Sequence, residues 1–208
     1  MIQVFGLDIG GANIKSALLK AEGGLIETLE TAVEYFPIWR RGKEQLPVVL
    51  EEIRKGAIDQ IEVDGVGVTM TAELSDAYRT KREGVGHILD CVAQVFADAR
   101  LFVLDVEANL RSIEDARREP IRVAAANWAA TGWMISKEIR DCIIIDIGST
   151  TTSIIPVASG RIAAAGRTDL EKLLNGELVY TGSLRTNVAA IVNSIPIRDG
   201  SARVSSEL

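Results

Sequence analysis

The sequence predicts an α/β protein that uses one kind of unit twice, and two observations support this. Residues 142–157 repeat the pattern of residues 4–19, in which an apolar run ends in aspartate, a turn of glycine and small polar residues follows, and a second apolar run returns. Between the two copies, β-branched runs alternate with segments of helical periodicity. The alternation indicates a sheet covered by helices, and the repeat indicates that this arrangement is duplicated.

The composition limits the classes of ligand. With 208 residues, 47% of them hydrophobic, the chain can bury one large core or two small ones. A net charge of −6 does not indicate the basic surface that nucleic-acid binding requires, so small molecules are the expected ligands. Cys91 and Cys142 are isolated in sequence and His87 is the only histidine. These counts argue against a disulfide framework, a zinc site and a histidine-rich metal site.

The N-terminus enters an apolar strand directly and lacks the basic region and long apolar core of a signal peptide. The most apolar longer run, residues 123–135, is too short to span a bilayer and contains Asn127. We therefore expect a cytoplasmic protein with no membrane partner. A homo-oligomer is compatible with the sequence.

The first unit opens with three expected antiparallel strands, residues 3–8, 13–20 and 25–35, of which the last two are joined around Gly23 and Gly24. A helix is expected over residues 42–56. Four apolar residues recur there at helical spacing: Leu46, Val49, Leu50 and Ile53.

Two more strands, residues 62–71 and 101–106, are expected to flank a helix at residues 82–99. The first of these strands runs into the loop 70–76. Open α/β sheets bind their ligands at the carboxyl ends of strands, so this loop is a candidate binding segment.

A charged segment, residues 110–119, is interpreted as a solvated helix or connection at the domain junction. The first domain is therefore placed at residues 1–119. The second, residues 120–208, is expected to begin with an Ala-rich linking helix over 121–137 in which Trp128 and Trp133 are buried.

The second unit is expected to be truncated. Residues 1–105 supply five predicted strands and two helices, whereas residues 142–208 are too few to supply the same set. Part of the second sheet would then be missing.

The turn of each repeated hairpin is where chemistry is expected. Glycine lets the backbone approach an anion, successive N–H groups form an anion-binding nest, and hydroxyl or amide groups add donors. A phosphate fits such a turn, and the aspartate before it is suited to hold Mg²⁺, for which we select Asp8 and Asp146. The alternative is that both aspartates only make turn hydrogen bonds. The candidate phosphate-binding residues are Gly10, Gly11, Asn13, Lys15, Gly148, Ser149, Thr150 and Thr151.

The order of elements is that of a ribonuclease-H-like fold used twice, and the paired Asp-Ile-Gly hairpins resemble the phosphate-binding elements of sugar kinases, Hsp70 chaperones and actin. Within that actin-like ATPase superfamily the chain is similar to the hydantoinase and oxoprolinase group, and more narrowly to the condensing enzymes of methanofuran biosynthesis in tetrahydromethanopterin-linked one-carbon metabolism. Most of the chain carries this resemblance. The more specific segments are residues 69–76, 80–85 and 179–186, and Ala72 stands where glycine is expected.

The resemblance implies a transferase. It would join an aminomethyl-furanylmethyl diphosphate to the phenolic amine acceptor γ-glutamyltyramine, release diphosphate and form an ether. Asp8 and Asp146 would act through Mg²⁺, and Glu73 or Asp76 would be the base for the phenol. Capping of the following helix by Ser75 or Asp76 explains that loop nearly as well.

Three further residues are candidate substrate contacts. Lys81 and Arg82 would bind a phosphate or the glutamyl carboxylate, with a solvated pair as the alternative, and Asn127 would contact ligand from the linking helix.

Two other functions remain open on the sequence. The hairpins would serve ATP equally well in a kinase or an oxoprolinase-type amidohydrolase, and a non-catalytic, actin-like nucleotide-binding module would use them without turnover. Whether ATP binds is not decided by the sequence.

Overall fold

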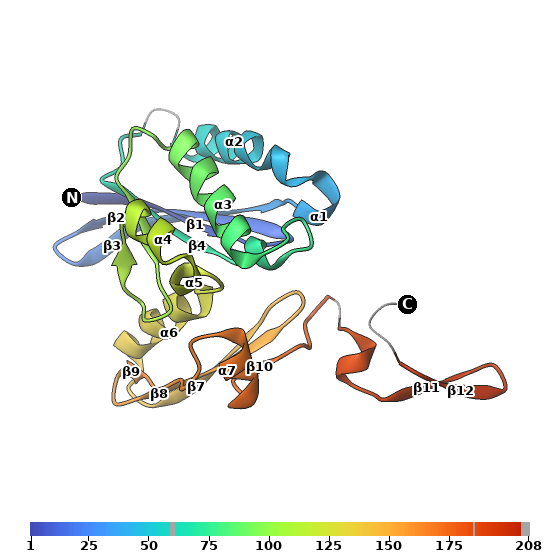
Figure 1. Cartoon of the computed structure of the whole chain (residues 1–208). Helices are drawn as coiled ribbons and strands as arrows, with labels where there is room; N and C mark the ends of the chain where they lie inside the picture. Colours follow the sequence, from blue (N-terminus) through green and yellow to red (C-terminus); the bar gives the residue numbers. More distant parts are fainter. Residues whose placement is uncertain (59–60, 185, 205–208) are drawn as a thin grey trace. The chain divides into compact units, whose positions relative to one another are not determined.

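The computed structural model describes residues 1–58, 61–184 and 186–204. The chain divides into two compact units, Met1–Thr131 and a second that begins at Gly132 (Figure 1). The expected junction after residue 119 falls inside the first unit, where α4 (Ile113–Arg118) and α5 (Pro120–Val123) pack against α3 (Lys81–Val95).

The described part of the first unit holds a six-stranded sheet in the order β3-β2-β1-β4-β5-β6. Its strands are β1 (Ile2–Ile9), β2 (Asn13–Glu22), β3 (Leu25–Tyr35), β4 (Gly65–Met70), β5 (Leu101–Leu104) and β6 (Leu110–Arg111). β1 runs antiparallel to β2 and parallel to β4, and β4 runs parallel to β5. The predicted strand order along the chain is confirmed.

Helices α2 (Leu46–Ile58) and α3 lie against one face of the sheet (Figure 1). The helix expected at 42–56 begins later, as α2, after a 3-10 turn (Lys43–Gln45). A short helix that was not expected, α1 (Ile38–Arg41), precedes it and ends at Gly42, whose φ of 87° suits glycine. A second 3-10 turn, η2, spans Ala72–Leu74. None of the helices in the described ranges is both long and apolar enough to cross a membrane.

Strand β1 sets the core of the first unit. Its side chains alternate between faces, and Phe5, Leu7 and Ile9 are all buried on the helix side. The ring of Phe5 lies 6.0 Å from that of Phe96, the residue that ends α3. Asp8 therefore points to the opposite face from this core.

The expected helix over 121–137 is wrong as one element. α5 ends at Val123, and α6 (Asn127–Glu138) begins only after Ala125, which adopts a left-handed conformation with φ of 51°. Trp128 is buried as expected, but Trp133 is 52% exposed and lies beneath the Lys137 ammonium. The alanine content predicts a continuous helix, whereas the observed break is held by a contact with a residue distant in sequence, described below.

The second unit carries a four-stranded sheet in its described residues. β8 (Thr152–Ala158) lies between β7 (Cys142–Ile147) and β10 (Leu178–Val179), and β9 (Arg161–Ile162) also pairs with β8. α7 (Asp169–Leu174) precedes β10. A 3-10 turn (Val188–Ala190) and a separate hairpin, β11 (Ser194–Ile197) with β12 (Gly200–Arg203), follow.

The repeated hairpin buries opposite faces in the two units. On β7 the counterparts of Phe5, Leu7 and Ile9 are Ile143, Ile145 and Ile147, and these are 69%, 63% and 61% exposed. The packed face is instead the one that carries Asp146, and it includes Ile155 and Val157. Within the ranges that the structure describes, no strand pairs with the outer edge of β7.

This difference can be measured by matched substitutions. Leu7→Ala removes buried methyl groups and should lower the free energy of unfolding by about 2–5 kcal/mol. Ile145→Ala, at an exposed position, should change it by only about 0.5 kcal/mol. Urea unfolding followed by circular dichroism measures both. Similar large losses in the two variants would show that Ile145 is covered in solution.

Candidate functional site

The first hairpin turn connects β1 to β2 through residues 10–13. The N–H of Gly10 donates to the carbonyl oxygen of Asn13 at 3.0 Å, and a Cβ at Gly10 would lie only 2.7 Å from that oxygen. The segment that follows β3 holds the turn in place as well. The N–H groups of Phe36 and Ile38 donate to the carbonyls of Ala12 and Gly11, each at 3.0 Å. The turn is therefore rigid and requires glycine at its first position.

Asp8 is held by its neighbours on both sides. It pairs in register with Lys15 on β2 and with Thr69 on β4. The Lys15 ammonium lies 3.2 Å from Asp8 Oδ2, and the Thr69 hydroxyl donates to Oδ1 at 3.2 Å. The Asp8 side chain is 26% exposed and that of Lys15 is 61% exposed, so both remain accessible to a ligand.

The second turn repeats this geometry. The Gly148 N–H donates to the Thr151 carbonyl oxygen at 2.8 Å, and Asp146 pairs with Ser153 as Asp8 pairs with Lys15. The N–H groups of Gly10 and Gly148 are thus engaged within their own turns, and the role of both glycines is to permit the turn.

A loop at residues 181–184 packs directly on the second turn. The Ser183 N–H donates to the Gly148 carbonyl at 2.9 Å, the Leu184 N–H donates to the Ser149 carbonyl at 3.2 Å, and the Thr152 hydroxyl donates to the Thr181 carbonyl at 2.8 Å. A Cβ at Gly182 would lie 2.5 Å from the Thr150 nitrogen. This contact explains physically why a glycine stands in the 179–186 segment, of which Arg185 is outside the described residues.

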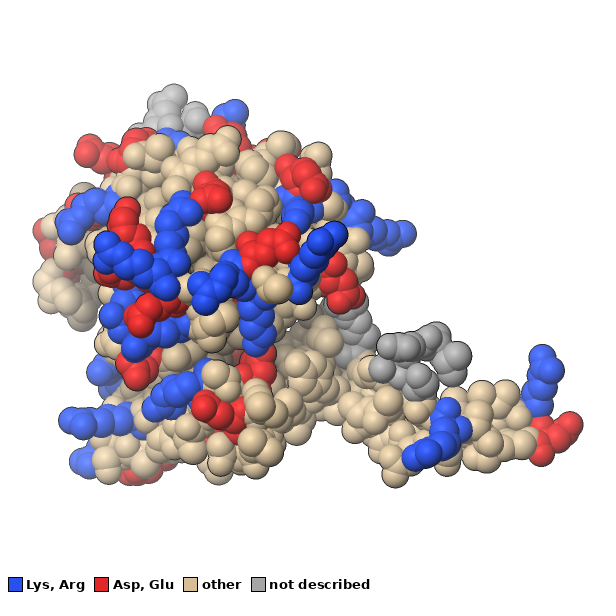
Figure 2. Space-filling view, viewed as in Figure 1, with Lys and Arg blue, Asp and Glu red and all other residues tan. Residues whose placement is uncertain are grey.

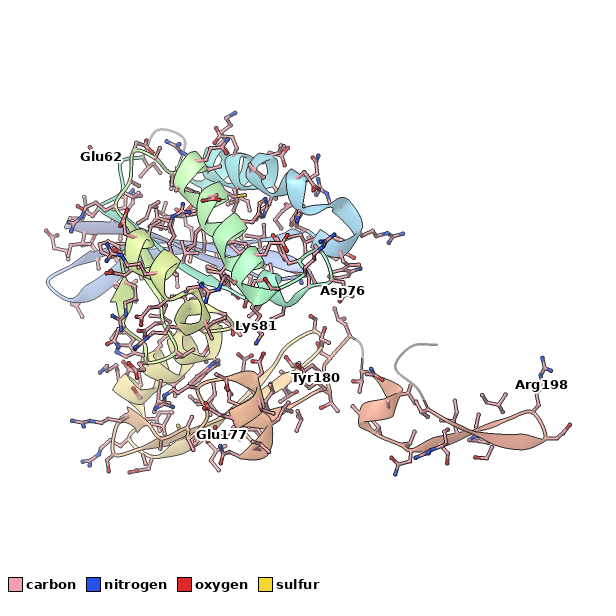
Figure 3. All side chains as sticks on the ribbon, viewed as in Figure 1. Glu62, Asp76, Lys81, Glu177, Tyr180 and Arg198 are labelled. Carbon is pink, nitrogen blue, oxygen red and sulfur yellow. The ribbon has the colours of Figure 1, made fainter. Side chains whose placement is uncertain are left out.

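Glu73 and Asp76 occupy different environments. Glu73 in η2 is buried, and its Oε1 accepts the N–H of Ala125 at 2.7 Å. This bond stabilises the break between α5 and α6. A Cβ at Gly84 would lie 2.6 Å from Glu73 Cβ, so α3 approaches the turn closely. Asp76 is exposed in the loop before α3 (Figure 3).

The remaining candidates lie at helix starts. Lys81 is the first residue of α3 and is half-buried, and Arg82 beside it is exposed (Figure 3). The cap of α3 is Thr80, whose hydroxyl accepts the Glu83 N–H at 3.1 Å, so capping by Ser75 or Asp76 is wrong. Asn127 begins α6 and its amide oxygen accepts the Trp128 N–H at 2.9 Å.

A family model described as hydantoinase/oxoprolinase matches residues 64–208. The chain belongs to the hydantoinase/oxoprolinase family. This confirms the family suggested by the resemblance of the two hairpins and their adjoining loops.

Two curated relatives share a name, (4-{4-[2-(gamma-L-glutamylamino)ethyl]phenoxymethyl}furan-2-yl)methanamine synthase. The one from Methanocaldococcus jannaschii is 40% identical over 207 residues, which are 99% of this chain and 58% of the relative. The one from Methanococcus vannielii is 52% identical over 68 residues, 33% of this chain and 30% of the relative. The chain thus spans well under two thirds of the length of either relative.

Solved structures confirm the fold class. Two crystal structures of Ppx/GppA proteins from Aquifex aeolicus superpose with a TM-score of 0.51 at 15% and 13% identity. They match 78% and 79% of this chain, and 49% and 51% of their own chains. This is the actin-like ATPase fold that the element order predicts.

The structure also shows a contact between three polar side chains that the sequence does not reveal. Tyr78 OH lies 2.9 Å from His87 Nδ1, and Cys91 Sγ lies 3.5 Å from His87 Nε2. Burial raises the pKa of Tyr78 and raises the pKa of Cys91 to about 11, so this thiol stays protonated and unreactive at neutral pH. These contacts join α3 to the loop before it.

Burial also lowers the pKa of His87, with the Lys43 ammonium as the second cause. The unfolded chain therefore takes up a proton before the folded chain does as the pH falls through about 6.5. Stability that is present at neutral pH should be lost below that value. Urea midpoints at pH 7.5 and 5.5 should differ more in the natural protein than in His87→Gln. An equal difference in both would remove His87 as the cause.

The second unit contains its own buried charges. The carboxylate of Glu177 accepts the N–H groups of Ala165 at 2.7 Å and Gly166 at 2.8 Å (Figure 3). Lys172 on α7 is buried beside it, and burial lowers the pKa of Lys172 to about 8, opposed by the carboxylates of Glu177, Asp169 and Asp146. Outside such clusters, basic and acidic side chains are interspersed on the face in view in Figure 2.

Proposed function

We propose that the chain acts as a transferase that condenses an aminomethyl-furanylmethyl diphosphate with the phenol of γ-glutamyltyramine. The observation that carries this proposal is 40% identity over nearly the whole chain to a synthase whose name specifies a product with that phenoxymethyl-furan ether. The chain covers only 58% of the length of that relative, so we propose, rather than infer from the identity alone, that it carries the whole reaction.

The reaction balances as a substitution at the furanylmethyl carbon. The phenol oxygen forms a bond to this carbon, the carbon–oxygen bond to diphosphate breaks, and its electron pair leaves with diphosphate. The phenolic proton passes to a base. The furan ring stabilises positive charge at the reacting carbon, so the main task of the protein is to stabilise charge on the leaving diphosphate.

The first hairpin supports that task with fixed groups. Lys15 is exposed and carries a positive charge beside the rigid glycine turn. Preorganised donors of this kind stabilise a developing anion without reorganising during the reaction. Asp76 is the better placed of the two candidate bases, because Glu73 is buried and already binds the Ala125 N–H.

Mg²⁺ suits the carboxylates that precede the turns. This ion retains several waters and binds through one or two carboxylates together with substrate phosphates. Asp8 in the first unit and Asp146 in the second would each serve as such a ligand at its own turn, and an ion bound there would neutralise charge on the phosphate oxygens.

Substitution of these aspartates tests the proposal. Asp8→Asn and Asp146→Asn should each lower kcat for diphosphate release by about 100-fold or more, because a ligand of the Mg²⁺ that would neutralise the leaving diphosphate is lost. Circular dichroism should show both variants folded. Asp199→Asn, an exposed site on the β11–β12 hairpin, is the control and should retain full activity.

The assay contains the furanylmethyl diphosphate, γ-glutamyltyramine and Mg²⁺. Full rates in both aspartate variants would remove these residues from the site. Hydrolysis of ATP without release of diphosphate from the furanylmethyl substrate would favour the kinase or amidohydrolase interpretation, and nucleotide binding without turnover would favour a binding module.

A further inference from the structure

Ser75 lies in the loop between β4 and α3, and the proposed reaction gives it no role. Its N–H donates to the Ala72 carbonyl at 3.0 Å, and its carbonyl accepts the Tyr78 N–H at 3.2 Å. The Ser75 Oγ is buried and has no hydrogen-bond partner in the part of the chain that the structure describes. Thr80, not Ser75, caps α3. The backbone of Ser75 is therefore fixed, while its hydroxyl group remains available.

The loop that carries Ser75 lies beside the first hairpin turn. The Thr71 N–H donates to the Ile9 carbonyl at 3.0 Å, so the loop begins next to the end of β1. A Cβ at Gly10 would lie 3.6 Å from Thr71 Oγ1, and a Cβ at Gly11 would lie 4.0 Å from Ser75 Cβ. Two hydroxyl-bearing residues thus flank the two glycines of the turn.

The position beside Gly11 is open, unlike the position beside Gly10. A Cβ at Gly10 would lie 2.7 Å from the Asn13 carbonyl oxygen. At Gly11, among described residues other than its chain neighbours, the nearest atom to such a Cβ is Ser75 Cβ, at an ordinary van der Waals distance. Gly11 is also not among the glycines with positive φ. Neither crowding nor backbone conformation therefore requires glycine here, and a side chain would fill the space in front of Ser75.

The peptide groups of the turn are oriented by the segment that follows β3. The carbonyls of Gly11 and Ala12 accept N–H groups from residues 36–38 at 3.0 Å. In a trans peptide the N–H points in the opposite direction from the carbonyl, so the N–H groups of Ala12 and Asn13 point away from that segment. The Gly10 N–H is engaged within the turn. The backbone donors suited to an anion here are those of Ala12 and Asn13.

Contacts on its other side hold the loop in place. The Leu74 N–H donates to the Thr71 carbonyl at 3.2 Å, and the Glu73 carboxylate accepts the Ala125 N–H at 2.7 Å. A Cβ at Gly84 would lie 2.6 Å from Glu73 Cβ, so α3 packs tightly on the loop. A hydroxyl group carried by such a fixed loop is a preorganised donor.

We infer that Ser75 contacts phosphate at the first turn, where its hydroxyl donates to an oxygen of a diphosphate that occupies the open position beside Gly11. Ser75 as a residue is partly exposed, so rotation about its Cα–Cβ bond brings Oγ from its enclosed position to the surface of the turn. The hydroxyl keeps its proton throughout. That this diphosphate is a leaving group rests on the proposed function, whereas the contact with the anion does not.

Removal of the hydroxyl tests the contact. Ser75→Ala should weaken the binding of inorganic diphosphate with Mg²⁺, measured by calorimetry, about tenfold or more, because a hydrogen bond to a charged group is lost. Without ligand, the urea midpoint should be unchanged or higher, because the hydroxyl that is removed has no partner. Unchanged affinity for diphosphate would overturn the inference, whatever the effect on the midpoint.

Ser136→Ala is the matched control. The Ser136 hydroxyl is also buried, but it donates to the Trp133 carbonyl at 2.7 Å on α6. This substitution should lower the urea midpoint and leave the affinity for diphosphate unchanged, which is the reverse of the result expected for Ser75→Ala. Equal losses of affinity in the two variants would contradict a contact specific to Ser75.

Gly11→Ala tests the location of the anion. Its methyl group meets no close contact in the protein but fills the open position, so the variant should fold with an unchanged midpoint and bind diphosphate more weakly. The losses in Gly11→Ala and Ser75→Ala should not multiply in the double variant, because an anion kept away by the methyl group no longer reaches Ser75. Losses that multiply would show that Ser75 and Gly11 do not face the same anion.

Turnover separates this inference from the proposed function. If Ser75→Ala loses affinity for diphosphate while the natural protein does not condense the two substrates, the transferase proposal fails and the contact stands. If the natural protein condenses them and Ser75→Ala has the same kcat and KM, the contact is wrong and the transferase proposal stands. A natural protein that binds no inorganic diphosphate would also overturn the contact.

Discussion

The constraint on which the rest of the structure depends is the short turn that follows each repeated aspartate. In both copies a glycine N–H closes the turn onto a carbonyl three residues later, at 3.0 Å in the first and 2.8 Å in the second. Closure fixes the register of the two strands, and the two-residue period of a strand then fixes the face of every side chain. A carboxylate two residues before the glycine must point away from the face that carries Leu7 and Ile9, or Ile145 and Ile147.

The two units differ in which face of this hairpin is packed. In the first, α2 and α3 cover the face opposite the aspartate, so Asp8 and Lys15 stay partly open to solvent. In the second, the packed face is the one that carries Asp146, and the isoleucine face is exposed. The same hairpin therefore holds its aspartate in two environments: Asp8 lies on a partly open face beside the exposed ammonium of Lys15, and Asp146 lies on the packed face of its sheet.

The strands and both hairpins could be predicted because their signals are local: alternating apolar residues, glycine at the turn, and the repeat itself. Contacts between distant residues could not. The Ala-rich segment 121–137 has high helix propensity throughout, yet the buried carboxylate of Glu73 holds the N–H of Ala125 and interrupts it. Similarly, Thr80 rather than Ser75 or Asp76 caps α3, and the turn at 72–74 packs closely against this helix at Gly84.

The candidate site was predictable only in part, for a related reason. Asp8, Gly10 and Lys15 lie within one hairpin, so the sequence places them together, and the structure adds Thr69 from a parallel strand as a further donor to Asp8. The packing of residues 181–184 on the second turn could not be predicted in the same way, because contacts between distant residues rather than sequence spacing bring them together.

A substitution that expels diphosphate needs no covalent nucleophile, and it places its largest charge change on phosphate oxygens. The groups suited to that change are backbone donors and cations already fixed before the ligand arrives, because they do not reorganise as the bond breaks. Each glycine turn is held by neighbouring backbone, but the glycine N–H is engaged within its own turn, so a phosphate would need other donors at the hairpin. In the proposed reaction the ammonium of Lys15 would supply positive charge at the first turn. The two copies of one hairpin place their matched aspartates on differently packed faces, so a ligand would meet different neighbours at each.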